Sequence, residues 1–567
     1  MTESTWDREV DVLVVGTGNG GLTAAICNWE LGTKNVLIIE KADKVGGTSA
    51  TSGGGIWIPN NHYAKEAGAE DNHEDAKKYL MNTLFGEDVP EEMIDIYLEK
   101  SPEMLQFMHD RTDVRYESLA EYPDYYTNVE GARAGHRSLE PAPIMASDLG
   151  KNWKNMTWTH FMMRMFNRIH FTQVEAHLLM VQLPGWKKLM ARLLWDYVKD
   201  IGWRLKTPIS RRLACGSAGV ARLYLSALKR DIPIEFNTRM VELIADGDRV
   251  EGAVIEVNGE RQRIRASKGV VLASGGFEKN QELREKYLPA PTNTEWSAGN
   301  PGNEGDALLA GLELGAKTRL MKDAWWTTTL CVPDEPAPRL AIMEKSFPGS
   351  CVVNRDGKRF ANESQNYMAF QKDLFRSHTE EHPNAPAWHV FDATFRENFM
   401  VGPLMTKAMK PDSQIPKKWF ETGFVAKADT IRELADTLGI DADGLEDTIG
   451  KMNHYATTGK DEDFGRGDSA YDRYYADPAI KPNPCLAPIA KAPFYAMRIE
   501  AGDFGTLGGL DTDTHARVKK ADGGVFEGLF AVGNCSAAIL PTYPGPGATL
   551  GPAMTMAYQA ARHINAA

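Results

Sequence analysis

One turn near the carboxyl end of the chain carries groups that could stabilise negative charge on an oxygen atom. Residues 542–547 read Thr-Tyr-Pro-Gly-Pro-Gly, so a phenol lies four residues before a glycine. The prolines stiffen the backbone, and a glycine lets another molecule approach the main chain closely. The hydroxyl of Tyr543 and the N–H of Gly547 could therefore converge on one carbonyl oxygen and stabilise an enolate formed beside it.

The amino-terminal end has the pattern of a dinucleotide-binding strand–helix–strand unit. A strand-like run at 11–15, apolar from Val12 on, is followed at once by Gly-Thr-Gly-Asn-Gly-Gly at 16–21, and a helix-like run begins at Leu22. A second strand-like run at 35–39, apolar from Val36 on, ends at the acid Glu40. The glycine motif alone is weak evidence, but strand, glycines, helix, strand and acid in this order predict a Rossmann-type nucleotide site.

Each residue of this motif has its own physical task. Gly16 permits the tight turn, Gly18 lets the backbone approach a pyrophosphate, and Gly21 lets the helix pack closely on the strand. The amino terminus of the helix then faces the phosphates, where its dipole favours negative charge. We expect the carboxylate of Glu40 to accept a hydrogen bond from the adenosine ribose.

Glycine- and hydroxyl-rich segments elsewhere indicate a flavin dinucleotide. Residues 46–55 read Gly-Gly-Thr-Ser-Ala-Thr-Ser-Gly-Gly-Gly, and strand-then-glycine patterns return at 269–277 and 528–534. The chain thus resembles the flavoproteins of the fumarate reductase and succinate dehydrogenase superfamily, in which both ends of the chain bind FAD. Beyond the motif above, the residues that this resemblance implies for FAD binding are Lys41, Gly47, Thr48, Ser49, Ser52, Gly53, Gly54, Val241, Ser274, Gly275, Gly533, Asn534 and Leu550.

The same resemblance implies the fold class. It is α/β, with a Rossmann-type FAD-binding domain built from both chain ends, 1–320 and 501–567, and an inserted α+β catalytic cap domain at 321–500. The strand and helix pattern loosens beyond residue 320, where the cap is expected to begin. A chain of 567 residues is too long for one core, which agrees with more than one domain.

Three tyrosine-bearing motifs occur in one order along the chain. Residues 122–126 read Tyr-Pro-Asp-Tyr-Tyr, residues 362–367 read Asn-Glu-Ser-Gln-Asn-Tyr, and residues 543–547 read Tyr-Pro-Gly-Pro-Gly. Together they resemble the 3-ketosteroid Δ1-dehydrogenases, whose pattern combines these three motifs. The resemblance covers nearly the whole chain.

This resemblance implies how hydrogens at C1 and C2 of a 3-ketosteroid would be removed. Tyr543 and Gly547 would hold the oxygen O3, which acidifies the neighbouring C2 hydrogen. Tyr367 would take that hydrogen as a proton, while C1 gives a hydride to flavin N5. A phenol has a pKa of about 10 and is a weak base at neutral pH. Tyr125 would therefore hydrogen-bond Tyr367 and make its oxygen more basic, and an alkaline activity optimum is expected.

Three other functions stay open at this point. A 3-ketosteroid Δ4-(5α)-dehydrogenase of the same superfamily shares the Asn-Glu-Ser region, but the 543–547 motif favours the Δ1 enzymes. A fumarate-type reductase needs arginine and histidine side chains to grip a dicarboxylate, and the motifs here carry tyrosines instead. A membrane-docked flavin electron carrier would need no phenolic base at Tyr367.

Composition argues against several other classes of protein. The net charge of −13 disfavours nucleic acid as a partner. The six cysteines are scattered, with no CxxC and no histidine spacing that suits zinc, so neither a metal centre nor disulfide chemistry is expected. The polar amino terminus does not resemble a signal peptide, and the chain has no long uncharged apolar run. We therefore expect a cytoplasmic protein.

The segment 151–206 differs from the rest of the chain. It holds ten Lys or Arg against three acids and five of the thirteen tryptophans. From Trp186 to Leu205 apolar residues recur at helical spacing with basic residues between them, which is typical of a helix lying in a membrane interface. We expect peripheral attachment to the inner face of the cell membrane, where side-chain-bearing steroids such as cholest-4-en-3-one would enter.

Two other uses of segment 151–206 are an interface between copies of the chain in a homo-oligomer and a lid over the steroid entrance. The remaining partner expected is an external electron acceptor, a quinone or another carrier.

Overall fold

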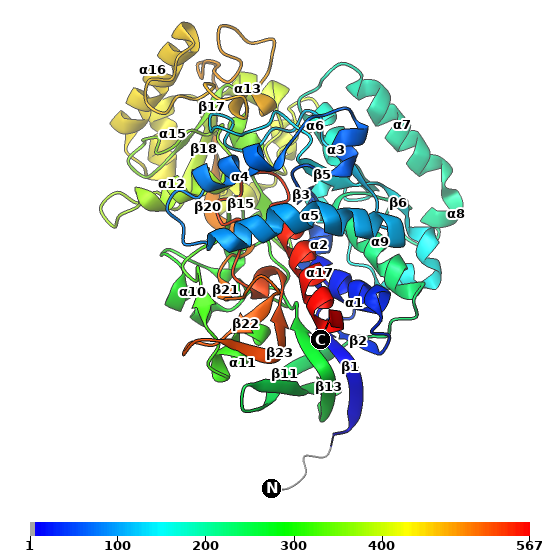
Figure 1. Ribbon diagram of the computed structural model, residues 1–567. Coiled ribbons are helices and arrows are strands. Elements are labelled where there is room, and N and C mark those ends of the chain that lie inside the picture. The colour runs from blue at the N-terminus through cyan, green and yellow to red at the C-terminus, as the bar shows by residue number, and fades with distance from the viewer. Residues whose placement is uncertain (1–5, 567) are drawn as a thin grey trace.

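The computed structural model describes residues 6–566, and its larger sheet takes strands from both ends of the chain (Figure 1). β1 (Arg8–Val15) lies parallel to β2 (Val36–Ile39) and β13 (Glu260–Leu272), and β13 also pairs with β23 (Val525–Ala531). The other strands of this eight-stranded sheet are β10 (Ile234–Glu235), β11 (Thr238–Asp246), β12 (Arg249–Val257) and β22 (Arg517–Lys519).

Helices from the two chain ends pack together beside this sheet. α1 (Asn19–Leu31) joins β1 to β2, and α17 (Leu550–Ala566) contacts both α1 and α5 (Glu91–Arg111) (Figure 1). Because helices cover the parallel strands, the Val12–Val14 run of β1 is fully buried. The predicted α/β fold built from both chain ends is thereby confirmed.

A second, antiparallel sheet of six strands carries the cap. Its long strand β20 (Phe494–Thr506) pairs with β15 (Ala324–Leu330), β18 (Ala387–Phe391) and β19 (Val425–Ala428). β16 (Arg339–Leu340) and β17 (Ser350–Val353) complete it, and α12 (Tyr367–Arg376), α15 (Ile431–Leu438) and α16 (Ala442–Thr458) flank it. β20 runs through residue 500, so this strand joins the two parts. The domain limits given above stay predictions.

Segment 151–206 folds as a small subassembly at the edge of the molecule. It contains α6 (Gln173–Met180), α7 (Trp186–Lys199) and α8 (Ile201–Arg204), and α7 and α8 lie on the outside in Figure 1. The single amphipathic stretch predicted there is interrupted, because the backbone at Asp200 is not helical (φ −86°, ψ 57°). None of the helices in residues 6–566 is long and apolar enough to cross a membrane.

The apolar residues of α7 and α8 divide between two environments. Leu189 and Leu193 are buried against Ile169 of the same segment. Trp195, Val198, Ile201 and Leu205 are exposed, the last at 84%. The predicted stripe is therefore partly an internal core and partly an uncovered apolar surface.

Candidate active site

One continuous cavity runs from the amino-terminal glycine loop to the three predicted tyrosines. Both chain ends and the cap contribute to its walls. The predicted FAD-binding residues that line it are Gly16, Gly18, Glu40, Lys41, Gly47, Thr48, Ser49, Ser52, Gly53, Gly54, Ser274, Gly275, Gly533, Asn534 and Leu550. Segments far apart in the sequence thus meet where a dinucleotide would lie.

Two predicted FAD residues do not line the cavity. Gly21 lies against the carbonyl oxygen of Gly16, where a Cβ would clash, so it permits close helix–strand packing as expected. Val241 lies at an irregularity of the ladder between Met240 and Glu242 in β11. Met240 lines the cavity and Val241 does not, because successive side chains of a strand point to opposite faces of the sheet.

The amino terminus of α1 suits a pyrophosphate. Gly18 is its N-cap, no side chain caps the first turn, and no acid lies in that turn. The backbone N–H groups and the positive end of the helix dipole are therefore available to an anion. Gly16 adopts φ 107°, and a Cβ there would lie 2.5 Å from the Ala273 carbonyl oxygen, so only glycine fits this turn.

Charged residues surround the nucleotide end of the cavity. The Glu40 carboxylate accepts hydrogen bonds from the N–H and hydroxyl of Thr17 (3.1 and 2.5 Å) and from the N–H of Ala42 (3.0 Å). The Lys41 ammonium pairs with Glu304 (3.0 Å) and Asp306 (2.8 Å). An oriented acid and free backbone donors are the groups that a ribose and a diphosphate require, so these residues fit FAD.

The turn that carries Tyr543 is held from several sides. Tyr543 adopts the left-handed conformation (φ 58°), which is uncommon for a residue other than glycine. The carbonyl of Pro544 accepts hydrogen bonds from the Tyr79 hydroxyl (2.6 Å) and the Tyr125 N–H (2.8 Å). The Gly547 N–H donates to the Tyr543 hydroxyl oxygen (3.4 Å), so the two groups predicted to hold a carbonyl oxygen lie beside each other.

The three predicted catalytic tyrosines lie together and line the cavity. Their ring centroids are 5.7 Å apart for Tyr125 and Tyr367, 5.6 Å for Tyr125 and Tyr543, and 5.7 Å for Tyr367 and Tyr543. Burial raises the pKa of Tyr367 well above its usual range, nearby Tyr543 raises it further, and the Tyr125 hydroxyl opposes the rise. Tyr125, whose hydroxyl favours the phenolate form, therefore lies beside Tyr367, the proposed base.

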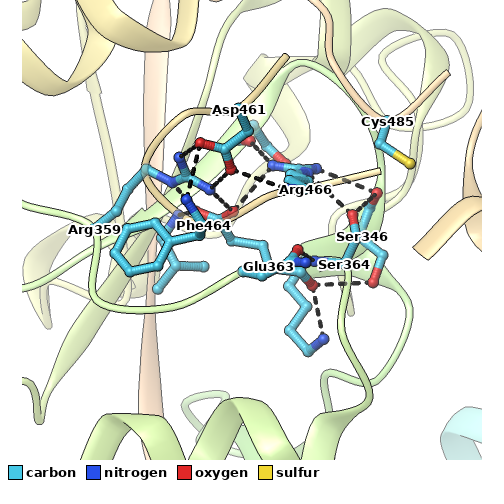
Figure 2. A network of polar contacts seen from close by, with 12 residues as sticks. Ser346, Arg359, Glu363, Ser364, Asp461, Phe464, Arg466 and Cys485 are labelled. Carbon is cyan, nitrogen blue, oxygen red and sulfur yellow. Dashed lines mark hydrogen bonds and ion pairs between the residues drawn. The ribbon is translucent and has the colours of Figure 1, made fainter. Parts of the chain in front are cut away.

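A buried ionic network holds the loop that precedes Tyr367 (Figure 2). The Glu363 carboxylate accepts from Arg359 (2.7 and 2.8 Å) and Arg466 (3.3 Å), and Arg359 also pairs with Asp461 (2.8 Å). These side chains are almost completely buried. If one of these side chains were removed, its partner would remain as an uncompensated buried charge. The contacts that tie this loop to the 461–466 segment are therefore costly to break.

The start of α12 then sets the direction of the phenol. The side chain of Asn366 caps the helix by accepting from the Ala369 N–H (2.9 Å), and Tyr367 is the first helical residue. The Lys345 ammonium donates to the main-chain carbonyls of Glu363 (2.8 Å) and Gln365 (2.7 Å), just before Tyr367 in the chain. Burial lowers the pKa of Lys345 to about 7. Lys345 was not anticipated from the sequence.

Further aromatic residues line the cavity. Trp325 packs edge-on against Tyr543 (centroids 5.4 Å apart) and donates to Asn534 (3.0 Å), whereas Trp326 points elsewhere. Tyr122, Tyr474, Tyr475, His177 and Phe504 also line the cavity. The Tyr-Asp-Arg-Tyr-Tyr run at 471–475 is as rich in tyrosine as residues 122–126, which was the available signal.

Comparison with known proteins agrees with this geometry. A family model described as an FAD binding domain matches residues 11–550. The 3-oxosteroid 1-dehydrogenase of Mycobacterium tuberculosis is 39% identical over 98% of each chain. This chain belongs to the FAD-dependent 3-oxosteroid 1-dehydrogenase family. FAD is therefore its cofactor, and the predicted family and enzyme class are confirmed.

Three further proteins that resemble this chain include one of the same activity and two that act on other bonds or substrates. A 3-ketosteroid Δ1-dehydrogenase from Sterolibacterium denitrificans, solved with 1,4-androstadiene-3,17-dione, is 41% identical with a TM-score of 0.94, covering 99% of this chain and 100% of that one. The 4-oxocyclohexanecarboxylate 2-dehydrogenase of Sinomonas cyclohexanicum is 38% identical over 98% of this chain and 92% of its own. A Δ4-(5α)-dehydrogenase from Rhodococcus jostii RHA1 (20% identity, TM-score 0.66, covering 100% and 98%) shares the fold.

Proposed function

We propose that this protein removes the hydrogens at C1 and C2 of a 3-ketosteroid, with FAD as the hydride acceptor. The observation that carries the proposal is the position of Tyr367, a buried phenol, beside the two donors of Tyr543 and Gly547 in a cavity that begins at the nucleotide loops. Relatives of 39% and 41% identity that are named for this reaction support the substrate class.

The side chains divide the chemistry between them. Tyr543 and Gly547 hold O3 and stabilise the charge that develops on it, and one such donor typically contributes about 3 kcal/mol. This acidifies the C2 hydrogen, which the Tyr367 oxygen takes as a proton, while Tyr125 favours the phenolate form of Tyr367. FAD, when bound, supplies the acceptor for the C1 hydride. An external quinone or another carrier then takes the electrons.

A small cyclic ketone acid is the second candidate, because one relative of 38% identity acts on 4-oxocyclohexanecarboxylate. The cavity walls argue for the steroid. Among the described residues, the Lys and Arg side chains that line the cavity are Lys41, Lys44 and Arg239, all at the nucleotide end. Burial lowers the pKa of the lining His160 to about 4, so it is neutral and offers a carboxylate no charge.

Apolar side chains from segment 151–206 and from residues 340–343 also line the cavity. They are Met162, Met163, Phe171, Leu340, Ile342 and Met343. Such a wall gains free energy by covering a hydrocarbon ring system, roughly 25 cal/mol for each Å² of apolar surface removed from water. It therefore suits a steroid better than a short acid.

Anaerobic mixing tests the proposal directly. The purified holoenzyme is mixed with 4-androstene-3,17-dione, 4-oxocyclohexanecarboxylate or succinate, and the loss of flavin absorbance is followed. The steroid should bleach the flavin rapidly and succinate should not. Bleaching by the cyclic acid alone would establish the second candidate, and bleaching by succinate alone would overturn both.

We also propose that the exposed apolar surface of α7 and α8 contacts the membrane surface peripherally. Trp195, Val198, Ile201 and Leu205 are uncovered, and basic residues of the same segment surround them. An apolar face with a cationic fringe suits an anionic lipid surface. The segment also supplies Met162 and Phe171 to the cavity wall, so a steroid in the bilayer would lie near its site.

Flotation with lipid vesicles distinguishes membrane contact from the other proposed uses of this surface, a dimer interface or a lid. Trp195→Glu with Leu205→Glu should lower binding to phosphatidylcholine vesicles that contain phosphatidylglycerol, while Phe85→Glu, at another exposed apolar residue, should not. Loss of a dimer on size exclusion would assign the surface to a second copy of the chain. Unchanged flotation would contradict the membrane proposal.

A further inference from the structure

A second group of tyrosines lies behind the catalytic three. The hydroxyls of Tyr122 and Tyr475 are 2.9 Å apart and buried. The Tyr122 ring lies 6.3 Å from that of Tyr125 and stacks on Tyr474 (4.6 Å, interplanar angle 8°). All four residues line the cavity. The proposed reaction gives a role to Tyr125 and none to the others.

Four phenols follow one another from Tyr367 to Tyr475. The ring centroids are 5.7 Å apart for Tyr367 and Tyr125 and 6.3 Å apart for Tyr125 and Tyr122, and the Tyr122 and Tyr475 hydroxyls are hydrogen-bonded. Burial raises the pKa of Tyr122, and the nearby Tyr475 and Tyr125 hydroxyls oppose that rise, as Tyr125 does for Tyr367. Neighbouring phenols are therefore placed to pass a proton in the order Tyr367, Tyr125, Tyr122, Tyr475.

The base needs such a route because it is enclosed. Tyr367 is only 5% exposed, and its cavity face would be covered by the substrate whose proton it takes. Unless that proton leaves, the phenol cannot accept another one in the next turnover. The series leads from Tyr367 to the 471–475 segment, away from the Tyr543 and Gly547 donors.

A histidine lies at the far end of the series. The His177 ring of α6 stacks on Tyr474 (4.1 Å) and lies 6.0 Å from the Tyr475 ring. Its Nε2 is 2.9 Å from the Tyr474 carbonyl, which can only accept, so Nε2 carries the hydrogen. Burial lowers the pKa of His177, so the ring is neutral and its Nδ1 presents a lone pair.

The two ends of the series are held relative to each other. Asn362, in the loop before Tyr367, donates to the Asp472 carboxylate (2.9 Å), which lies in the segment that carries Tyr475. The ion pair of Arg466 with Glu363 in Figure 2 joins the same two segments. The spacing between the base and Tyr475 is thus fixed by buried contacts.

We propose that the hydroxyls of Tyr125, Tyr122 and Tyr475 form a proton outlet that carries the substrate's C2 proton from Tyr367 toward His177. The inference rests on the proposed function. Only protons move: each hydroxyl forms one O–H bond as it gives up another, and no electrons are transferred. Tyr122 and Tyr475 thereby act through Tyr367 and do not touch the reacting carbon.

Isotope wash-out from C2 measures this outlet separately from oxidation. The holoenzyme, with its flavin chemically reduced beforehand, is mixed with 4-androstene-3,17-dione deuterated at C2. With no hydride acceptor available, the protein can only remove the C2 deuteron and return a hydrogen. The rate at which deuterium leaves the steroid therefore reports proton removal followed by exchange with solvent.

Tyr122→Phe and Tyr475→Phe should each slow wash-out by about tenfold or more, which is less than the roughly 100- to 10,000-fold contributed by a group that itself takes the substrate's proton. The double variant should be no slower than either single variant, because both lie on one route. Tyr495→Phe is the control: it removes a buried hydroxyl that donates to Asp412 (2.6 Å) outside the cavity, and it should leave the rate within about twofold.

Three results separate the possible failures. If Tyr122→Phe and Tyr495→Phe slow wash-out equally, or if the Tyr122 and Tyr475 effects add independently, the outlet is refuted. Steroid binding, followed by perturbation of the flavin spectrum, should be unchanged in Tyr122→Phe, and a large loss of affinity would assign that residue a structural role. If the unaltered protein neither exchanges deuterium nor is bleached by the steroid, the proposed function itself fails.

Discussion

The hydroxyl oxygen of Tyr543 lies 3.4 Å from the backbone nitrogen of Gly547, and the ring of Tyr543 lies 5.7 Å from that of Tyr367. The first pair comes from one turn of the FAD-binding part, and Tyr367 comes from the cap. The stiff turn thus holds the two proposed donors beside each other, and the ring of the proposed base lies next to them. This relationship has consequences that can be measured.

Removal of one donor should slow the reaction without unfolding the protein. Tyr543→Phe should lower kcat/KM by about 100-fold, because one hydrogen bond to the developing oxyanion is worth about 3 kcal/mol. Tyr558→Phe, which removes a hydroxyl bound to Glu103 outside the cavity, is the control and should keep normal kinetics. Equal rates for Tyr543→Phe and the unaltered protein would contradict a role in holding O3.

Gly547 is required for its shape as well as for its N–H. Its φ is 97°, and a Cβ would lie 2.5 Å from the Cα of Ile56. Gly547→Ala should lower both activity and the free energy of unfolding, the latter by roughly 2–4 kcal/mol. Gly523→Ala is a matched control, because its φ is 108° but nothing lies near the added Cβ. Thermal unfolding measures the loss of stability in each variant. Gly547→Ala reports backbone strain together with the clash, and Gly523→Ala reports backbone strain alone.

Activity should rise with pH through the neutral and alkaline range. Burial raises the pKa of Tyr367, so the phenolate is the minor form at neutral pH and its fraction grows as pH increases. Tyr125→Phe removes the hydroxyl that opposes this rise and should shift the profile of kcat/KM to still higher pH. A profile that falls from neutral to alkaline pH in the folded enzyme would argue against a phenolic base.

The Glu363 network should make the cap sensitive to acid. Burial alone would raise the pKa of Glu363, but Arg359 and Arg466 hold it below its usual range. Its contribution to stability is therefore present above the pKa of the unfolded chain and lost as pH falls through the lower pKa of the folded state. The slope of melting temperature against acidic pH should be smaller in Glu363→Gln.

The same variant should lower the free energy of unfolding by about 3–5 kcal/mol, because two guanidinium groups lose their buried partner. Asp447→Asn, which breaks an exposed pair with Lys451, should cost less than about 1 kcal/mol. Similar losses in the two variants would show that the network does not hold the cap.

Local patterns predicted the groups that depend on local backbone shape. The glycines at 16–21 and the turn at 543–547 have sequence signals because their conformations admit few other residues. The pairing of Tyr122 with Tyr475 and of Glu363 with Arg466 had no such signal, since the partners are 353 and 103 residues apart and meet only in the folded chain. The break at Asp200 and the bulge at Val241 are also set by packing around them, which periodicity does not report.

Tyr367→Phe tests the central claim most directly. The variant should still bind FAD and 4-androstene-3,17-dione, because only one hydroxyl is removed. In anaerobic mixing, however, reduction of the flavin by the steroid should slow by several orders of magnitude, since the C2 proton has no acceptor. Flavin reduction at the unaltered rate would contradict the assignment of Tyr367 as the base.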